Sequence, residues 1–394
     1  MTRAVVVIDG EHYAPVVRDA IAELPYDVVG AWLAGGTEKL RGDDEYGVPL
    51  LAELDDGFAH AQVVVDLSDE PVLGPRERFL LASRALAAGL RYEGADFHFD
   101  PPQYAPFPLP SLSVIGTGKR VGKTAVTGHV ARLLARDRDV VVVSMGRGGP
   151  AEPEIAVVQP TLASLLDLSR AGHHAASDYL ETAALTGVVT VGCRRAGGGL
   201  AGGVVTSNVP EGAALAAERE PDIVVFDGSG AAIPPVETDA RILVSGRGHD
   251  PMAYLNPYRV LVSDLVVLVG GGDAGSIRAL KDVRVLTAEL RLRPVTPLHG
   301  RRVAVFTTGP AVTDGLEADI VSVSRNLANR PQLSEDLART DADVYLVEIK
   351  AAAIDLVAEA ARKRDVEVVF AENEVLCDGL DAAILGLVPA GAHA

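Results

Sequence analysis

The sequence has little cysteine, few aromatic residues and a deficit of basic residues. Only Cys193 and Cys377 occur in 394 residues, which is too few for a metal cage or a disulfide framework, so we expect a reducing compartment, the cytoplasm. The 36 basic residues face 54 acidic ones, a net charge of -18, which argues against nucleic acid as a partner. Apolar runs are strand-sized, so we expect neither a signal peptide nor a membrane span.

Short runs of Val, Ile and Leu alternate with alanine-rich amphipathic segments along the chain. This alternation predicts an α/β fold with parallel strands. In the first hundred residues we predict strands near 4–8, 27–32 and 62–66, and helices near 14–24 and 76–90. These elements predict a small Rossmann-like domain.

A proline-rich segment, "FDPPQYAPFPLPSLS", follows the first hundred residues. Its fixed φ angles and missing donors suit a stiff connector. We therefore predict an N-terminal Rossmann-like α/β domain over 1–107 and a catalytic domain over 108–394, with 300–394 as a C-terminal α/β extension. The further predicted elements are strands at 112–115, 140–144, 265–269, 302–307 and 344–348, a strand ending at 227, and helices at 123–136 and 351–363.

The segment "SVIGTGKRVGKTAV" links a predicted strand to a predicted helix. A strict G-x-x-x-x-G-K-T loop needs glycine at 117, where this chain has Thr117. The strand–turn–helix context nevertheless predicts an anion site of backbone N–H groups at the positive end of a helix dipole. Lys123 would reach the β- and γ-phosphates and Thr124 would offer a hydroxyl to Mg²⁺. The alternative is an ordinary glycine turn.

Asp227 ends the predicted strand "IVVF" and is the candidate acidic partner of this loop. A Mg·nucleotide site of this class takes an acidic residue from the tip of a neighbouring strand. An Asp-Gly turn after a strand is the alternative interpretation. The sequence thus predicts a P-loop NTPase-type parallel sheet with helices on both faces.

The loop is similar to the variant found in dethiobiotin synthetase and its relatives, in which Gly-Thr precedes Val-Gly-Lys-Thr. Partitioning ATPases carry a signature lysine where this chain has Gly118, and Lys119 lies one place later, so an enzyme that uses ATP on a small molecule is favoured over a dimer switch. No N-K-x-D or T-K-x-D guanine signature follows, which favours ATP over GTP. The predicted ATP-binding residues are Gly116, Thr117, Gly118, Lys119, Arg120, Val121, Gly122, Lys123 and Thr124, and Lys119 joins Lys123 and Asp227 as a catalytic candidate.

Arginines inside glycine-rich loops indicate where an anionic substrate would bind. "SMGRGGPAEPE" contributes Arg147, and "GCRRAGGGLAGG" contributes Arg194 and Arg195. Glycine lets the backbone approach an anion and arginine binds phosphate oxygens in a bidentate manner, although solvated surface arginine is the alternative. Glu11 and His12, in "VIDGEHYAP" at the end of the first strand, are further substrate candidates, with a packed or surface histidine equally open.

The stretch "AGHHAASDYLE" brings histidines and carboxylates together. The spacing of His173 and His174 lacks the H-x-x-x-H geometry of a zinc helix, so we do not predict zinc. Asp178 and Glu181 either are exposed or face the active cleft.

Taken together, "VVVIDGEHYAPVV", "VIGTGKRVGKTAV", "SMGRGGPAEPE", "SDYLETAALTGVVTVGCRRAGGGLAGG" and "VVFDGSGAAIPP" resemble the cyclic 2,3-diphosphoglycerate synthetase family over nearly the whole chain. The resemblance implies ATP- and Mg²⁺-dependent conversion of 2,3-diphosphoglycerate to its cyclic pyrophosphate, with ADP and phosphate released. It also implies the loop for ATP and Mg²⁺, Asp227 for the metal, Arg147, Arg194, Arg195 and His12 for the substrate, and a homodimer.

Three other functions remain open. These are another P-loop small-molecule kinase, a dethiobiotin-synthetase-like ligase, and a regulatory NTPase whose hydrolysis switches a partner surface. No convincing Ser/His/Asp or Cys/His set is present, which agrees with a reaction in which a substrate phosphate supplies the attacking oxygen.

Overall fold

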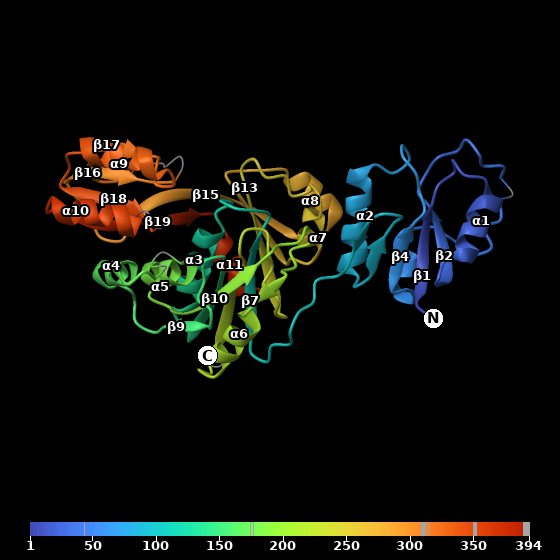
Figure 1. Cartoon of the computed structure of the whole chain (residues 1–394), viewed down its shortest axis with the longest axis horizontal. Coiled ribbons are helices and arrows are strands. Elements are labelled where there is room, and N and C mark those ends of the chain that lie inside the picture. Colours follow the sequence, from blue (N-terminus) through green and yellow to red (C-terminus); the bar gives the residue numbers. More distant parts are fainter. Residues whose placement is uncertain are drawn as a thin grey trace.

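The computed structural model describes residues 1–42, 44–173, 175, 177–308, 313, 315–349 and 353–388. It has a mixed α/β architecture with two large, mostly parallel sheets, as predicted. The sheets belong to separate lobes along the long axis of the molecule, and an extended connector joins them (Figure 1). No helix in the described ranges combines the length and the apolar character that crossing a membrane requires.

The N-terminal sheet has the strand order β3-β2-β1-β4-β5-β6. Its central strands are parallel, and alternate residues of β1 enter two different hydrophobic clusters, so both faces of the sheet are covered. The elements are β1 (Arg3–Ile8), α1 (Ala14–Glu23), β2 (Asp27–Leu33), β3 (Leu50–Leu51), the 3-10 helix η1 (Leu54–His60), β4 (Val63–Asp66), α2 (Pro75–Ala87), β5 (Arg91–Glu93) and β6 (His98–Phe99).

The N-terminal lobe packs on the central lobe through one shared hydrophobic cluster. Leu81 and Ala85 of α2 belong to the same cluster as Leu255 and Tyr258 near α7 (Asn256–Leu261). The connector lies against residues 235–237, because Ala105 exchanges backbone hydrogen bonds with Pro235 and Glu237. The proline-rich segment therefore has partners along its course and is held against the central lobe.

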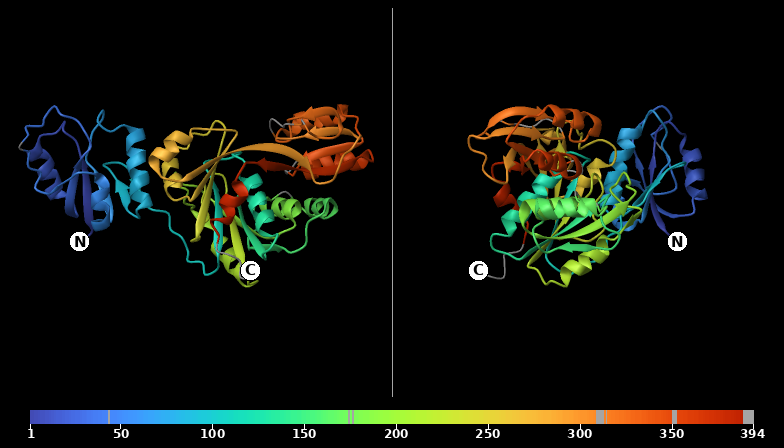
Figure 2. Two further views of the ribbon diagram at one scale, coloured as in Figure 1. Left: turned by 180° about the vertical axis from the view of Figure 1, so that it is seen from behind. Right: turned by 60° about the vertical axis from the view of Figure 1, so that its left-hand side comes forward.

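The central sheet begins with the order β11-β10-β8-β12-β7-β13-β14-β15, and β9 pairs with β10. Further elements of this lobe are β7 (Ser111–Gly116), α3 (Lys123–Leu134), β8 (Val140–Gly146), β9 (Glu154–Ala156), α4 (Leu162–Arg170), α5 (Asp178–Thr186), β10 (Val189–Ala196), β11 (Thr206–Ser207), α6 (Val209–Ala217), β12 (Ile223–Asp227), β13 (Ala240–Gly246), β14 (Leu265–Val269), α8 (Ala274–Leu280) and β15 (Arg284–Pro294). Helices lie on both faces of this sheet (Figure 2).

The burial pattern of β8 explains why both faces need helices. Val140 and Val142 pack into the cluster under α3, whereas Val141, Val143 and Met145 pack into the cluster under α6. A strand that is apolar on both sides must be covered twice, and this is typical of parallel sheets with βαβ crossovers. The carboxyl ends of β7, β8 and β12 consequently meet at one edge.

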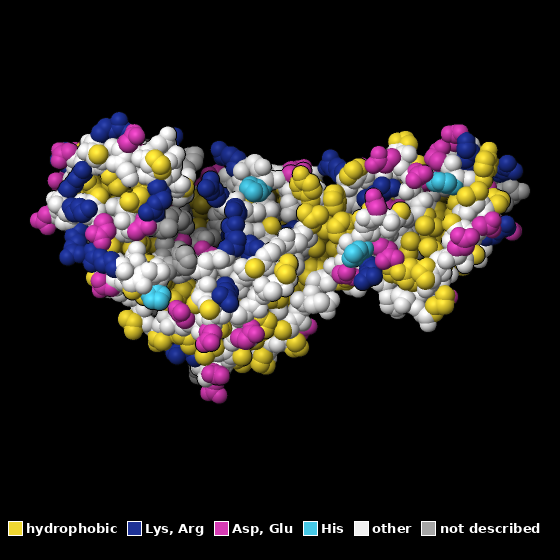
Figure 3. All heavy atoms as spheres, in the orientation of Figure 1, with side chains coloured by type: hydrophobic (Ala, Val, Ile, Leu, Met, Phe, Trp, Pro, Cys, Tyr) yellow, Lys and Arg dark blue, Asp and Glu magenta, His cyan; other side chains and the backbone are white. Residues whose placement is uncertain are grey.

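The C-terminal strands extend the same sheet with the order β19-β18-β16-β17. The long strand β15 pairs with β14 at its start and with β19, antiparallel, over Glu289–Pro294. The elements are β16 (Arg302–Phe306), β17 (Asp319–Ser324), α9 (Arg330–Arg339), β18 (Val344–Glu348), the π-helix η2 (Ala353–Ala358), α10 (Glu359–Lys363), β19 (Glu367–Leu376) and α11 (Leu380–Leu385). This lobe stands beside the central one, and basic side chains gather near the hollow between them (Figure 3).

The strands and helices predicted from the sequence are present, with ends that differ by a few residues. The predicted helix over 351–363 begins outside the described residues, and its described part starts as a π-helix and continues as α10. Its first two residues are not described. The sequence did not indicate the antiparallel β15–β19 pair, which joins the C-terminal strands to the central sheet.

Candidate active site

The segment between β7 and α3 forms a phosphate-binding loop. Gly122 has φ 90° and Arg120 has φ 60°, both in the left-handed region, and the helix begins at Lys123. The turn therefore presents the N-terminus of α3 to the cavity described below, where unsatisfied N–H groups and the helix dipole favour an anion. Thr117 is buried, and its hydroxyl donates to Ser245 Oγ at 3.1 Å.

Gly118 occupies its position for a steric reason. A Cβ atom built there would lie 2.5 Å from Cε1 of His249, closer than real Cβ contacts come. A lysine at this position, as in the partitioning ATPases, would therefore require His249 to move. Gly116 is similarly confined, because a Cβ on it would lie 3.0 Å from the carbonyl oxygen of Gly230.

Asp227 meets the loop from the tip of β12. Lys123 Nζ donates to Asp227 Oδ1 at 2.5 Å, and Thr127 Oγ1 donates to the same oxygen at 2.7 Å. The carboxylate is 1% exposed, so these two contacts compensate much of the cost of burying its charge. β12 pairs in parallel with β7 and β8, which is why a residue distant in sequence lies beside the loop.

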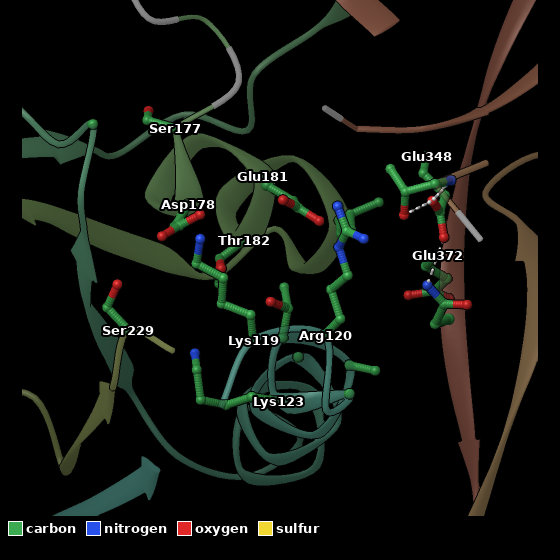
Figure 4. Close-up of a pocket in the computed structure, with 18 of the residues that line it drawn as sticks. Lys119, Arg120, Lys123, Ser177, Asp178, Glu181, Thr182, Ser229, Glu348 and Glu372 are labelled. Atoms are coloured by element: carbon green, nitrogen blue, oxygen red, sulfur yellow. Dashed lines mark hydrogen bonds between the residues drawn. The ribbon is translucent and has the colours of Figure 1, made fainter. Parts of the chain in front are cut away.

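A cavity of about 990 Å³ opens in front of the loop. Its described walls include the phosphate loop with the first turns of α3, residues of α5 and the turn before it, the segments that follow β8 and β12, and the C-terminal strands. In Figure 4 the loop contributes Lys119, Arg120 and Lys123, the facing wall carries Ser177, Asp178, Glu181 and Thr182, and a third wall carries Glu348 and Glu372. Cations and carboxylates thus face one another across the same space.

The wall formed by α5 shows which interpretation of its carboxylates holds. Glu181 is only 7% exposed, and both Asp178 and Glu181 line the cavity. Glu181 therefore faces the cleft, whereas Asp178 is exposed and also forms part of the cavity wall, so both interpretations apply to Asp178. Lys119 points toward this wall (Figure 4). His173 also lines the cavity, and His174 lies outside the described residues.

The three candidate arginines are placed differently. Arg147, just after β8, lines the cavity. Arg195 reaches its edge, donating to the carbonyl of Ser229 at 2.8 Å, and its pKa is lowered by burial and by the nearby Arg147 charge, against the opposing effect of Asp178. Arg194 is exposed, and its backbone N–H donates to Asn208 Oδ1 at 2.6 Å. Adjacent strand residues point to opposite faces, so β10 does not present both arginines in one direction.

Glu11 and His12 lie in the N-terminal lobe and do not line the cavity. Glu11 Oε1 accepts the backbone N–H of Thr37 at 3.1 Å. His12 lies between two carboxylates, with Nδ1 2.8 Å from Asp9 Oδ1 and Nε2 3.4 Å from Asp69 Oδ2. The structure therefore does not bring these two residues to the phosphate loop of the same chain.

The C-terminal wall contains residues that the sequence did not identify. Arg132 on α3 pairs with Glu372 on β19 at 2.7 Å, and its pKa is lowered by burial, an effect that Glu372 opposes. Arg293 also pairs with Glu372. The carboxylate of Glu348 lines the cavity beside Asn373. The only sequence signal for this wall was that Glu348 ends a predicted strand.

Comparisons with known proteins cover nearly the whole chain. Family models of cyclic 2,3-diphosphoglycerate synthetase match in three parts: the N-terminal domain at residues 3–100, the P-loop domain at 111–282 and the C-terminal domain at 294–374. A protein of Rubrobacter xylanophilus named cyclic 2,3-diphosphoglycerate synthetase is 47% identical over 98% of this chain and 97% of its own length. The chain belongs to the cyclic 2,3-diphosphoglycerate synthetase family.

Two further members of this family are similar over comparable lengths. The synthetase of Thermococcus kodakarensis is 40% identical over 96% of each chain. That of Methanothermus fervidus is 38% identical over 98% of this chain and 96% of its own. Among solved structures, LpxK from Aquifex aeolicus in complex with ATP aligns over 73% of this chain and 91% of its own, with a TM-score of 0.46 and 15% identity.

Proposed function

We propose that this protein catalyses the ATP-dependent ring closure of 2,3-diphosphoglycerate to cyclic 2,3-diphosphoglycerate, releasing ADP and phosphate. The relationship to synthetases of that name extends over almost the full chain. One observation carries the proposal: a single cavity contains the phosphate loop, Lys123 and Arg147. Such a cavity can hold a nucleoside triphosphate beside a second phosphorylated molecule.

The loop and its partners suit a Mg·ATP complex. In the proposed complex Lys119 and Lys123 neutralise the phosphates, and Thr124 and Asp227 hold Mg²⁺. The donors fit the metal, because a hydroxyl and a carboxylate are hard oxygen ligands and the described hydrogen bonds of Asp227 use only Oδ1. When bound, Mg²⁺ supplies positive charge to the phosphate oxygens of the nucleotide.

We propose a reaction in two displacements. An oxygen of one substrate phosphate attacks the γ-phosphorus of ATP, and the bond to ADP breaks. An oxygen of the neighbouring substrate phosphate then attacks the phosphorus that carries the new group, expels inorganic phosphate and closes the ring. The protein supplies charge neutralisation and alignment, since adjacent phosphates repel each other and no covalent nucleophile is needed.

We assign the substrate phosphates to Arg147, Arg195 and Arg194, with Glu11 and His12 as further contacts. Arg147 lines the cavity and Arg195 reaches its edge. Because Glu11 and His12 lie in the other lobe, we propose that the N-terminal lobe of a second copy in a homodimer brings them to the cavity. We further propose the domain division 1–107 and 108–394, with 300–394 as the C-terminal extension, and a cytoplasmic location.

Phosphorus NMR tests the proposed reaction directly. We expect purified protein with Mg·ATP and 2,3-diphosphoglycerate to give a cyclic pyrophosphate signal together with ADP and inorganic phosphate in equal amounts. An acyclic product that keeps the transferred phosphoryl group would show a kinase instead. A rate of ATP hydrolysis that 2,3-diphosphoglycerate leaves unchanged and a macromolecule increases would show a regulatory NTPase. Consumption of ATP with a different small-molecule acceptor would show another ligase.

A further inference from the structure

The C-terminal strands contain a topological switch point at the edge that faces the cavity. From β16 the chain passes to β17 on one side and then to β18 on the other, and both neighbours run parallel to β16. Open α/β sheets bind ligands in the crevice where the strand order reverses, beyond the carboxyl ends of the strands. Thr308 follows β16, Glu348 ends β18, and both line the cavity.

The polar groups at this switch point are held in a fixed arrangement. Glu348 Oε2 accepts the backbone N–H of Thr308 at 2.8 Å and its hydroxyl at 3.0 Å. Glu348 Oε1 accepts Asn373 Nδ2 at 3.1 Å, and Asn373 comes from β19, which is parallel to β18. A carboxylate fixed by three donors, two from Thr308 just after β16 and one from Asn373 on β19, presents its remaining acceptor positions in a defined direction.

The two ends of the cavity differ in chemistry. The loop end carries Lys119, Lys123 and Arg147, whereas the wall away from the loop combines the apolar Ile354 and Ala371 with the charged residues Arg132, Asp355, Glu348 and Glu372. Ala125 and Gly128, two small residues of α3, also line the cavity. Small and apolar residues beside polar groups held in place can accommodate a flat heterocycle, whereas a cluster of cations is typical of a site for phosphates.

We infer that the C-terminal domain supplies the nucleobase subsite, in which Asn373 and Glu348 bind the edge of adenine. This inference rests on the proposed function, because it takes the phosphate loop as the site of the ATP phosphates. An ionised carboxylate only accepts hydrogen bonds. It therefore suits the 6-amino group of adenine and disfavours guanine, which places a carbonyl oxygen at that position.

The first test separates the base from the phosphates. Calorimetry on the full chain would compare ADP with inorganic tripolyphosphate, which occupies the loop but has no base. We expect Asn373→Ala to weaken ADP about tenfold and to leave tripolyphosphate unchanged. Glu374→Gln is the control, because Glu374 is the next residue of β19, pairs with Arg291 at 2.6 Å and does not line the cavity.

The second test concerns the choice of base. We expect the wild type to bind ADP more tightly than GDP, and Glu348→Gln to reduce this preference about tenfold, because an amide can donate to the guanine carbonyl. The inference would be overturned if Asn373→Ala lost equal affinity for ADP and for tripolyphosphate, or if Glu348→Gln left the ratio of ADP to GDP affinity unchanged. Neither result would overturn the proposed function, as long as phosphorus NMR still showed the cyclic product. Wild-type protein that binds no ADP would overturn both the inference and the proposed function.

Discussion

Asp9 and Asp227 occupy equivalent places in two different sheets. Each lies at or just beyond the carboxyl end of a central parallel strand, and they are 0% and 1% exposed. Each is held by donors of its own chain: Asp227 by Lys123 and Thr127, and Asp9 by backbone N–H groups and His12. They differ in their surroundings, because Asp227 lies at the phosphate loop and Asp9 does not.

The difference shows that two carboxylates buried equally well at strand ends can be satisfied in different ways. Asp9 uses both oxygens within its own lobe, since Oδ1 accepts Glu11 N–H and contacts His12, and Oδ2 accepts Asp69 N–H. Asp227 uses only Oδ1 in its described bonds, and the lysine that pairs with it lines the cavity. Asp227 therefore has one oxygen outside its described bonds, whereas both oxygens of Asp9 are engaged.

The largest expected effect follows from removing Lys123, the lysine that pairs with Asp227. We expect Lys123→Ala to lower turnover by at least about 10²–10³-fold, because a group that stabilises the transferring phosphoryl charge is lost. The phosphorus NMR assay measures this, and circular dichroism checks the fold. Lys363→Ala is the control, since Lys363 is exposed on α10 and does not line the cavity. If Lys123→Ala kept wild-type turnover, the phosphate loop would not have the proposed catalytic role.

Local sequence signals were sufficient for the part of the site that is contiguous in the chain. Glycines before Lys123 and Thr124, between an apolar run and an amphipathic one, have few alternative structures, so the loop could be predicted. Asp227 could be predicted because it ends an apolar run and parallel strands share one carboxyl edge. Glu181 could not be assigned, because a glutamate on a helix has the same pattern whether it faces water or a cavity.

The C-terminal wall could not be predicted for a different reason. Thr308, Glu348 and Asn373 follow or belong to three strands, and they meet only because β16, β18 and β19 are neighbours. Asn373 also depends on the antiparallel pairing of β19 with β15. A periodic apolar pattern indicates that strands exist, but it does not indicate which strands pair.

The next largest expected effect concerns the neighbouring arginines of β10, Arg194 and Arg195. We expect Arg195→Ala to raise the KM for 2,3-diphosphoglycerate roughly 10- to 100-fold, because a charged hydrogen bond to a phosphate is lost. Arg194→Ala should have a smaller effect, since Arg194 is exposed and Arg195 reaches Ser229 at the cavity edge. Steady-state kinetics with each substrate varied in turn measures both, and equal effects would contradict the placement of the two side chains.

His12 tests whether the N-terminal edge contributes to catalysis at all. We expect His12→Ala to raise the KM for 2,3-diphosphoglycerate about tenfold and to leave the affinity for ADP unchanged, with His60→Ala, an exposed histidine of the same lobe, as the control.

The same variant tests the sharing of sites between copies. If His12 acts on the cavity of a partner copy, a mixture of His12→Ala with Lys123→Ala should recover up to about a quarter of wild-type activity at limiting substrate after subunit exchange, because half of the dimers are hybrids with one intact site. If His12→Ala left the KM for 2,3-diphosphoglycerate unchanged, His12 would not take part in substrate binding.

The smallest expected effect concerns stability. Burial raises the pKa of Asp9, but the backbone N–H of Asp69, His12 and the N–H of Glu11 together outweigh it, so the pKa lies below the ordinary 3.8. Because the pKa of Asp9 is lower in the folded chain than in the unfolded chain, its ionised carboxylate stabilises the fold at pH values above the unfolded-state pKa. This stabilisation is lost as the pH falls through the folded-state pKa.

We therefore expect Asp9→Asn to lower the free energy of unfolding by about 1–3 kcal/mol at pH 7, because an amide group cannot accept every donor that the carboxylate accepts. The difference from wild type should shrink below roughly pH 4, where the wild type loses the same contribution. Urea unfolding at several pH values measures it, with the exposed Asp19→Asn on α1 as the control. A difference that stays constant down to pH 2.5 would show that the ionised carboxylate is not what stabilises this edge.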